Sequence, residues 1–101
     1  MTSVADPPES RVFLSPGSPN PFGASTRLSF ELPAPSRVQL RLYDAAGRLV
    51  RTLRDGRLPA GRHVAQWDGR DRDGRRVANG IYFAKLDAGG RSMTQRVVRL
   101  N

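Results

Sequence analysis

Short segments in which apolar and polar residues alternate restrict the fold of this chain more than any other feature. The clearest segment is residues 25–32, where one parity carries Leu28, Phe30 and Leu32 and the other carries charged or small polar residues. A period of two residues indicates a strand with one buried face. No stretch of the chain shows apolar residues at helical spacing. We therefore expect a protein built from strands.

Seven such segments recur at intervals of about ten residues, with glycine, proline and aspartate between them. We place them at residues 11–15, 25–32, 37–43, 48–53, 62–67, 80–86 and 92–100. This spacing predicts an all-β fold, an antiparallel β-sandwich of about seven strands. The short separation at residues 33–36 predicts a hairpin between the second and third segments. Residues 54–61 are expected to form a loop.

The inward parity of these segments supplies the predicted core, which consists of Leu28, Phe30, Leu40, Leu42, Trp67, Tyr82 and Leu86. Trp67 should fill the middle, because an aromatic side chain of that size buries more area than its neighbours. Phe22, at the end of a proline-rich stretch, is expected to anchor that stretch beneath the sheet. In the last segment the register is open. Either Val98 and Leu100 or Val97 and Met93 face the core.

The length of 101 residues suits one domain. We expect residues 1–10, which include two consecutive prolines, to be a linker or disordered tail, and residues 11–101 to be the β-sandwich domain. Cysteine is absent, and no apolar run reaches the roughly 18 residues that cross a bilayer, so we expect no membrane span. Residues 1–10 do not resemble a signal peptide. The signal of an exported parent would lie upstream.

A net charge of +8, carried mainly by arginine, allows two interpretations. The first is a polyanionic partner such as nucleic acid. The second is a solvated outer surface, which we favour because the charges are spread along every segment. Only residues 70–76 cluster, and there Asp68, Asp71 and Asp73 lie among the arginines. We therefore do not expect nucleic acid as a partner.

Catalytic and metal-binding patterns are sparse. His63 is the only histidine, and no residue is marked as a nucleophile, so we expect neither an enzyme nor a cofactor. Asp71 and Asp73 are candidates for a calcium site. The expected acidic series is broken at Gly69, and the neighbouring arginines lower the negative potential. An Asp-Gly turn is the favoured interpretation.

Two large apolar residues, Ile81 and Phe83, have the parity opposite to the predicted core. They would lie on the outer side of a sheet beside basic residues, where they could form a contact patch for a neighbouring domain or partner. Lys85 shares this outward parity. The alternatives are that residues 16–22 cover the pair, or that this parity is the buried one.

Several motifs together resemble a known bacterial family. They are Asn20-Pro21-Phe22, the alternating segment that ends at Leu32-Pro33, Leu42-Tyr43-Asp44 followed by Gly47-Arg48, Trp67-Asp68-Gly69, Asn79-Gly80-Ile81-Tyr82 and the closing Arg96-Val97-Val98. The set is similar to the Ig-like domain of flagellar hook-capping proteins. It equally resembles the C-terminal sorting domains of type IX secretion substrates.

The resemblance implies that the sandwich is Ig-like (fibronectin-III-like). It also implies a non-catalytic C-terminal accessory module of an exported bacterial protein, located outside the cell or at its surface. Such a module acts in secretion sorting, surface attachment or structural support. Its partners would be an upstream domain of the parent and the outer-membrane secretion machinery, which would recognise residues 89–100. Besides Ile81 and Phe83, the interaction candidates are therefore Arg96, Val97, Val98, Arg99 and Leu100.

Two alternatives remain open. The first is an adhesive or carbohydrate-binding module that uses the outer sheet face or residues 70–76. The second is a hook-cap-like assembly domain, which would associate with copies of itself.

Overall fold

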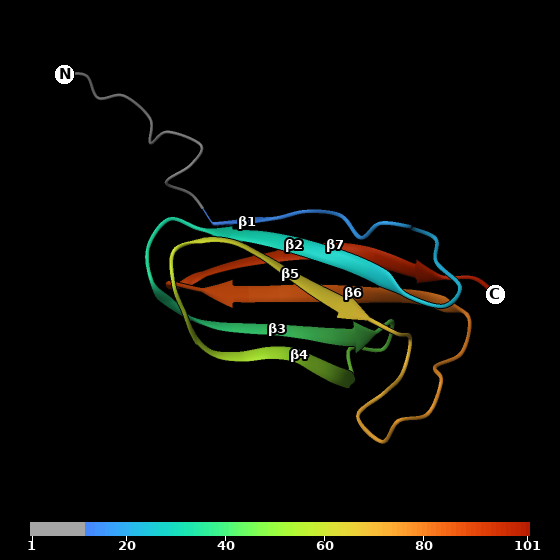
Figure 1. The fold of residues 1–101 in the computed structure, drawn as a ribbon. Helices are drawn as coiled ribbons and strands as arrows, with labels where there is room; N and C mark the ends of the chain where they lie inside the picture. The colour runs from blue at the N-terminus through green and yellow to red at the C-terminus, as the bar shows by residue number, and fades with distance from the viewer. Residues whose placement is uncertain (1–11) are drawn as a thin grey trace.

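A computed structural model describes residues 12–101, so the linker predicted at residues 1–10 lies outside the described residues. Two antiparallel sheets face each other, with strand orders β1-β2-β5 and β4-β3-β6-β7 (Figure 1). The predicted Ig-like β-sandwich is therefore confirmed. The strands are β1 (Phe13–Leu14), β2 (Thr26–Leu32), β3 (Ser36–Asp44), β4 (Leu49–Leu58), β5 (Gly61–Trp67), β6 (Gly80–Ala88) and β7 (Arg91–Arg99).

The inward parity of the strands fills the space between the two sheets. Trp67 is fully buried, and the rings of Phe22 and Tyr82 each lie 5.3 Å from it, centroid to centroid. Phe22 thus packs beneath the sheet. All residues expected in the core are buried, namely Leu28, Phe30, Leu40, Leu42, Trp67, Tyr82 and Leu86.

The connection between β2 and β3 differs from the predicted hairpin. β2 pairs with β5, whereas β3 pairs with β4 and β6, so residues 33–35 cross from one sheet to the other. The hairpin prediction was wrong because alternation fixes which face of a strand is buried but not which strand lies beside it. Crossing over lets the apolar faces of both strands meet in one core.

The loop predicted at residues 54–61 is also wrong over most of its length. β4 continues to Leu58, and only residues 59 and 60 separate it from β5. Register shifts after Leu40 and Leu42 accommodate the longer strand. β4 is an edge strand that pairs only with β3, and charged side chains are common on such strands because they discourage pairing with other chains.

The two ends of the sandwich differ in their connections. At one end Gly89 and Gly90 form a tight turn between β6 and β7, with φ angles of 56° and 79° that favour glycine. At the other end, where the C-terminus lies, residues 68–79 form the long loop from β5 to β6 (Figure 1). Residues 12–101 contain no helix, and so no helix that could cross a membrane.

Candidate interaction surface

The outer face of the four-stranded sheet carries a patch of apolar side chains. Residues paired across neighbouring strands lie side by side on one face. One row contains Leu49, Tyr43 and Phe83, and the next contains Ile81 and Val98. Ile81 is 43% exposed and Leu49 39% exposed, whereas the other three are half-buried. We call these five residues the outer patch.

The outer patch is not covered by the proline-rich stretch. Backbone bridges join Ser18 to Arg27 of β2 and Phe22 to Arg99 of β7, so that stretch follows strand edges. Ile81 and Phe83 therefore keep the outward orientation that their parity predicted, and the opposite choice of core face is wrong.

Beside the outer patch, the sheet places two cations directly opposite each other. Arg41 of β3 pairs in register with Lys85 of β6. Neither makes an ion pair with any residue between 12 and 101. The neighbouring Tyr43 side chain raises the pKa of Arg41, and the charges of Asp55 and Asp87 raise it further, so Arg41 remains a cation. Like charges opposite each other destabilise a sheet.

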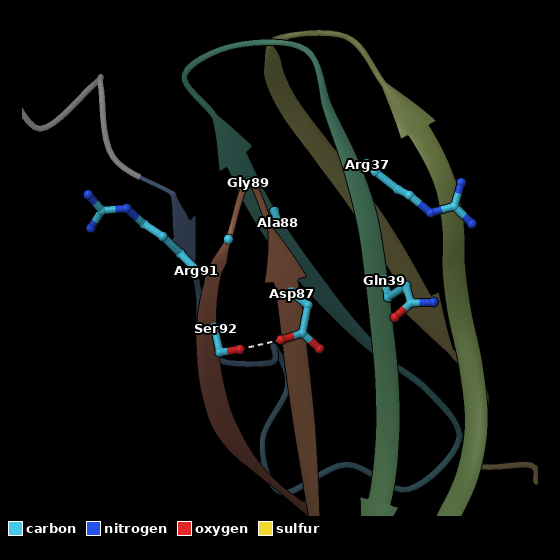
Figure 2. Close-up of a pocket in the computed structure, with 8 residues that line it drawn as sticks. Arg37, Gln39, Asp87, Ala88, Gly89, Arg91 and Ser92 are labelled. Carbon is cyan, nitrogen blue, oxygen red and sulfur yellow. Dashed lines mark hydrogen bonds between the residues drawn. The ribbon is translucent and has the colours of Figure 1, made fainter.

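The end of this face nearest the β6–β7 turn is polar and slightly hollowed. Gln39 and Asp87 pair across β3 and β6, and Ser92 of β7 donates a hydrogen bond to Asp87. Figure 2 shows Arg37 and Arg91 on either side of this hollow. Polar side chains thus occupy the part of this face between the Arg41–Lys85 pair and the β6–β7 turn.

The free edge of β7 is closed near its C-terminal end. Phe22 donates its backbone N–H to the carbonyl of Val98, and its carbonyl accepts from the N–H of Leu100, both at 2.9 Å. The Asn20 side chain accepts from the N–H of Val98 at 2.8 Å and donates to the carbonyl of Arg96 at 3.0 Å. These bonds occupy the backbone groups that a partner strand would need along this part of the β7 edge.

Two of the interaction candidates in β7 are inaccessible. Val97 is fully buried and Arg99 is 5% exposed, because the register turns Val97 and Met93, not Val98 and Leu100, towards the core. The Arg99 Nη1 atom donates to the carbonyl of Val77 at 2.7 Å. The proposal that Val97 and Arg99 contact a partner is therefore corrected.

The remaining β7 candidates lie at the surface. Arg96 is exposed, Val98 is half-buried, and Leu100 is 62% exposed. Arg96 pairs in register with Phe83 and extends the row that crosses the outer patch.

Two acidic residues of the β5–β6 loop, Asp68 and Asp71, take part in an ion pair and a turn. Asp71 accepts hydrogen bonds from the N–H groups of Asp73 and Arg75, at 2.9 and 3.0 Å. Asp68 pairs with Arg51 at 2.9 Å. Among residues 12–101, no group of three histidine, cysteine or acidic side chains converges where a metal could bind. These contacts make the loop a stabilised turn.

His63 lies at a strand surface. Its Nε2 atom is 2.8 Å from the carbonyl of Pro59, and its ring stacks on Phe30 with the centroids 5.3 Å apart. These contacts fix the imidazole against the sandwich.

Sequence reasoning missed two members of the surface, Arg41 and Tyr43. Their parity already placed them outward. Only the register of β3 against β6 brings them beside Lys85 and Phe83, and this register is not visible in either strand alone.

Residues 18–92 match the family described as the FlgD Ig-like domain. The chain belongs to this family. Among curated proteins, the "Basal-body rod modification protein FlgD" of Salmonella typhimurium and that of Salmonella typhi are each 44% identical to it over 72 residues. The aligned part covers 70% of this chain and 28% of either relative. This FlgD Ig-like domain thus spans under a third of those proteins.

Several solved structures are similar to this chain in fold. Dimeric latent PorU of Porphyromonas gingivalis has a TM-score of 0.68 at 21% identity, covering 88% of this chain and 9% of that one. PorZ of the same organism is described as an essential surface component of the type IX secretion system. It has a TM-score of 0.57 at 22% identity, and the match covers 89% of this chain and 11% of that one. FlgD from P. aeruginosa has a TM-score of 0.55 at 27% identity, and the match covers 73% of this chain and 58% of that one. The first two similarities show a shared fold.

Proposed function

We propose that this FlgD Ig-like domain is a non-catalytic accessory module of an exported bacterial protein, acting in secretion sorting or surface attachment. Family membership and the fold shared with PorU and PorZ support this role. On this proposal the domain works outside the cell or at its surface. Its partners are an upstream domain of the parent and the secretion machinery.

One observation carries the choice of surface. The edge of β7 is closed by Asn20 and Phe22, whereas the outer face of β6 and β7 presents Ile81, Phe83 and Arg96. Apolar groups rimmed by a cation are typical of surfaces that contact other proteins. Recognition therefore uses the face of the last hairpin.

A reporter fusion tests this function. The chain is placed behind an exported reporter in a bacterium that has a type IX secretion system, and surface and medium fractions are assayed. Replacing Ile81 and Phe83 together by threonine should leave most of the reporter in the periplasm. Val64→Thr is the matched control, because Val64 is 49% exposed on the other sheet. Equal export of the paired variant and the control would contradict the proposal.

A hook-cap-like assembly role is the second candidate, favoured by the 44% identity to the basal-body rod modification proteins. This role predicts that copies of the chain associate with one another. Light scattering across a concentration series measures the molar mass. A mass that rises to a defined oligomer supports assembly, and a constant monomer mass contradicts it.

A further inference from the structure

We propose that the outer face of the four-stranded sheet binds an acidic polysaccharide whose sugar units carry carboxylates. The proposal deepens the attachment role proposed above and rests on it for its biological setting. The binding itself depends only on the groups that this face presents.

The first argument is uncompensated charge. The face carries five cations, Arg37, Arg41, Arg57, Lys85 and Arg96, but only two carboxylates, Asp55 and Asp87. Among residues 12–101, the ion pair of Arg37 with Asp55, at 3.5 Å, is the only one on this face. The positive potential is therefore largely free to attract a polyanion.

The second argument is the arrangement of the cations. Arg37 lies opposite Arg57, and Arg41 lies opposite Lys85. Both arrangements cost stability in the free protein because like charges repel across strands. Along β3 the two pairs are four residues apart, or about 13 Å. Because β3 lies between β4 and β6, one linear polyanion lying along β3 would pass both pairs of cations.

The third argument is the kind of group between the cations. Tyr43 and Phe83 are half-buried neighbours beside Arg41 and Lys85, so their rings offer an apolar surface for the apolar face of a sugar ring. The same face also offers Gln39, Thr52 and Thr94, whose amide and hydroxyl groups bond to sugar hydroxyls. Aromatic, neutral polar and cationic groups together favour an acidic glycan.

Other occupants fit this face less well. A second copy of the chain would bring the same excess of positive charge against it, which disfavours association. Strand addition is blocked along the C-terminal part of β7 by Asn20 and Phe22. The basic β5–β6 loop competes poorly for an anion, because Asp68, Asp71 and Asp73 lie among its arginines.

Calorimetric titration of the 101-residue chain with an oligogalacturonate tests the proposal. The fully methyl-esterified oligosaccharide is the neutral control ligand and should bind about tenfold more weakly or not at all. The variant Arg41→Gln/Lys85→Gln should lose about tenfold in affinity, since two direct charge contacts disappear. Arg75→Gln/Arg76→Gln removes the same charge from the loop and should stay within about twofold.

Three results would overturn the proposal. The first is failure of the chain to bind oligogalacturonate, and the second is an equal loss of affinity in the face and loop variants. The third is equally tight binding of oligothymidylate or polyglutamate, because the partner would then be a nucleic acid or an acidic polypeptide. Circular dichroism of each variant checks the fold, and the face variant should melt no lower than the parent. The reporter fusion that carries Arg41→Gln/Lys85→Gln separates the two proposals. If this variant is exported normally but the glycan no longer retains it, the two cations act in glycan binding and not in secretion. If the parent fusion binds the glycan but is not exported, the sorting proposal is contradicted and the glycan proposal stands.

Discussion

Arginine is concentrated in two regions of this domain, the β5–β6 loop and the outer face of the four-stranded sheet, but its surroundings differ. In the loop, Arg70 lies 3.8 Å from Asp68, which also pairs with Arg51. On the outer face, Arg41 and Lys85 lie opposite each other, and neither has an ion-pair partner within residues 12–101. In the loop three aspartates thus lie among the four arginines, whereas on the outer face strand register brings cations directly opposite each other.

The loop has a structural task. The indole N–H of Trp67 donates to the carbonyl of Arg70 at 2.9 Å. The N–H of Arg72 donates to the carbonyl of Val50 at 2.9 Å, and the N–H of Val77 to that of Gly69 at 2.8 Å. These bonds hold the loop against the end of the sandwich. On the outer face the side-chain contacts among residues 12–101 include the ion pair of Arg37 with Asp55 and the hydrogen bond from Ser92 to Asp87.

The largest expected effect on stability comes from removing the Arg99 side chain, which contacts the β5–β6 loop. Arg99→Ala should lower the free energy of unfolding by about 2–3 kcal/mol, because the carbonyl of Val77 loses a charged donor. Arg96→Ala, three residues earlier on the outer face, should change it by less than about 0.5 kcal/mol. Urea denaturation measures both. Equal effects would contradict the distinction between the two arginines.

A smaller loss is expected within the loop itself. Asp71→Ala removes the acceptor of two backbone N–H groups and should cost about 1–2 kcal/mol. Asp73→Ala is the control, because the Asp73 carboxylate is exposed and makes no hydrogen bond with residues 12–101. If Asp73→Ala destabilises the domain as much, the account of the loop as a turn built on Asp71 fails.

The turn that follows β3 is expected to make a contribution to the free energy of unfolding that is lost in acid. The Asp44 carboxylate accepts backbone N–H bonds from Arg48 and Ala46 and pairs with the Arg48 side chain, which lowers its pKa in the folded state. Its contribution is therefore present above the unfolded pKa of about 3.9 and is lost as the pH falls through the lower folded value. Asp44→Asn should flatten the acid limb of the stability curve. An unchanged limb would contradict this assignment.

The smallest expected effect is a gain in stability. Lys85→Gln removes the repulsion with Arg41 and should stabilise the domain by about 0.2–1 kcal/mol at low salt. High salt screens the repulsion and should abolish the gain. Arg76→Gln, in the loop, should show no such gain. A loss of stability in Lys85→Gln would show that the cation pair is compensated.

Most of the fold could be predicted because local alternation fixes the buried face of each strand. The parity of residues 25–32 and 80–86 gave the inward Leu28, Phe30 and Tyr82. The partner of each strand could not be predicted, since pairing depends on the other strands. This is why β2 and β3 were expected in one hairpin but lie in separate sheets.

The candidate surface was only partly visible in the sequence. Parity identified Ile81, Phe83 and Lys85, but the placement of Arg41 opposite Lys85 required the register of β3 and β6. Arg99 was an interaction candidate because the family resemblance places recognition in residues 89–100. Only the folded loop brings the carbonyl of Val77 to it.

The central claim is that the outer face, and not the arginine-rich loop, takes the polyanion. Amide NMR spectra recorded while oligogalacturonate is added to the chain test it directly. The account predicts that the largest shifts occur at Arg41, Tyr43, Phe83 and Lys85, with small shifts across residues 70–76. Large shifts in residues 70–76 together with an unperturbed outer face would contradict it.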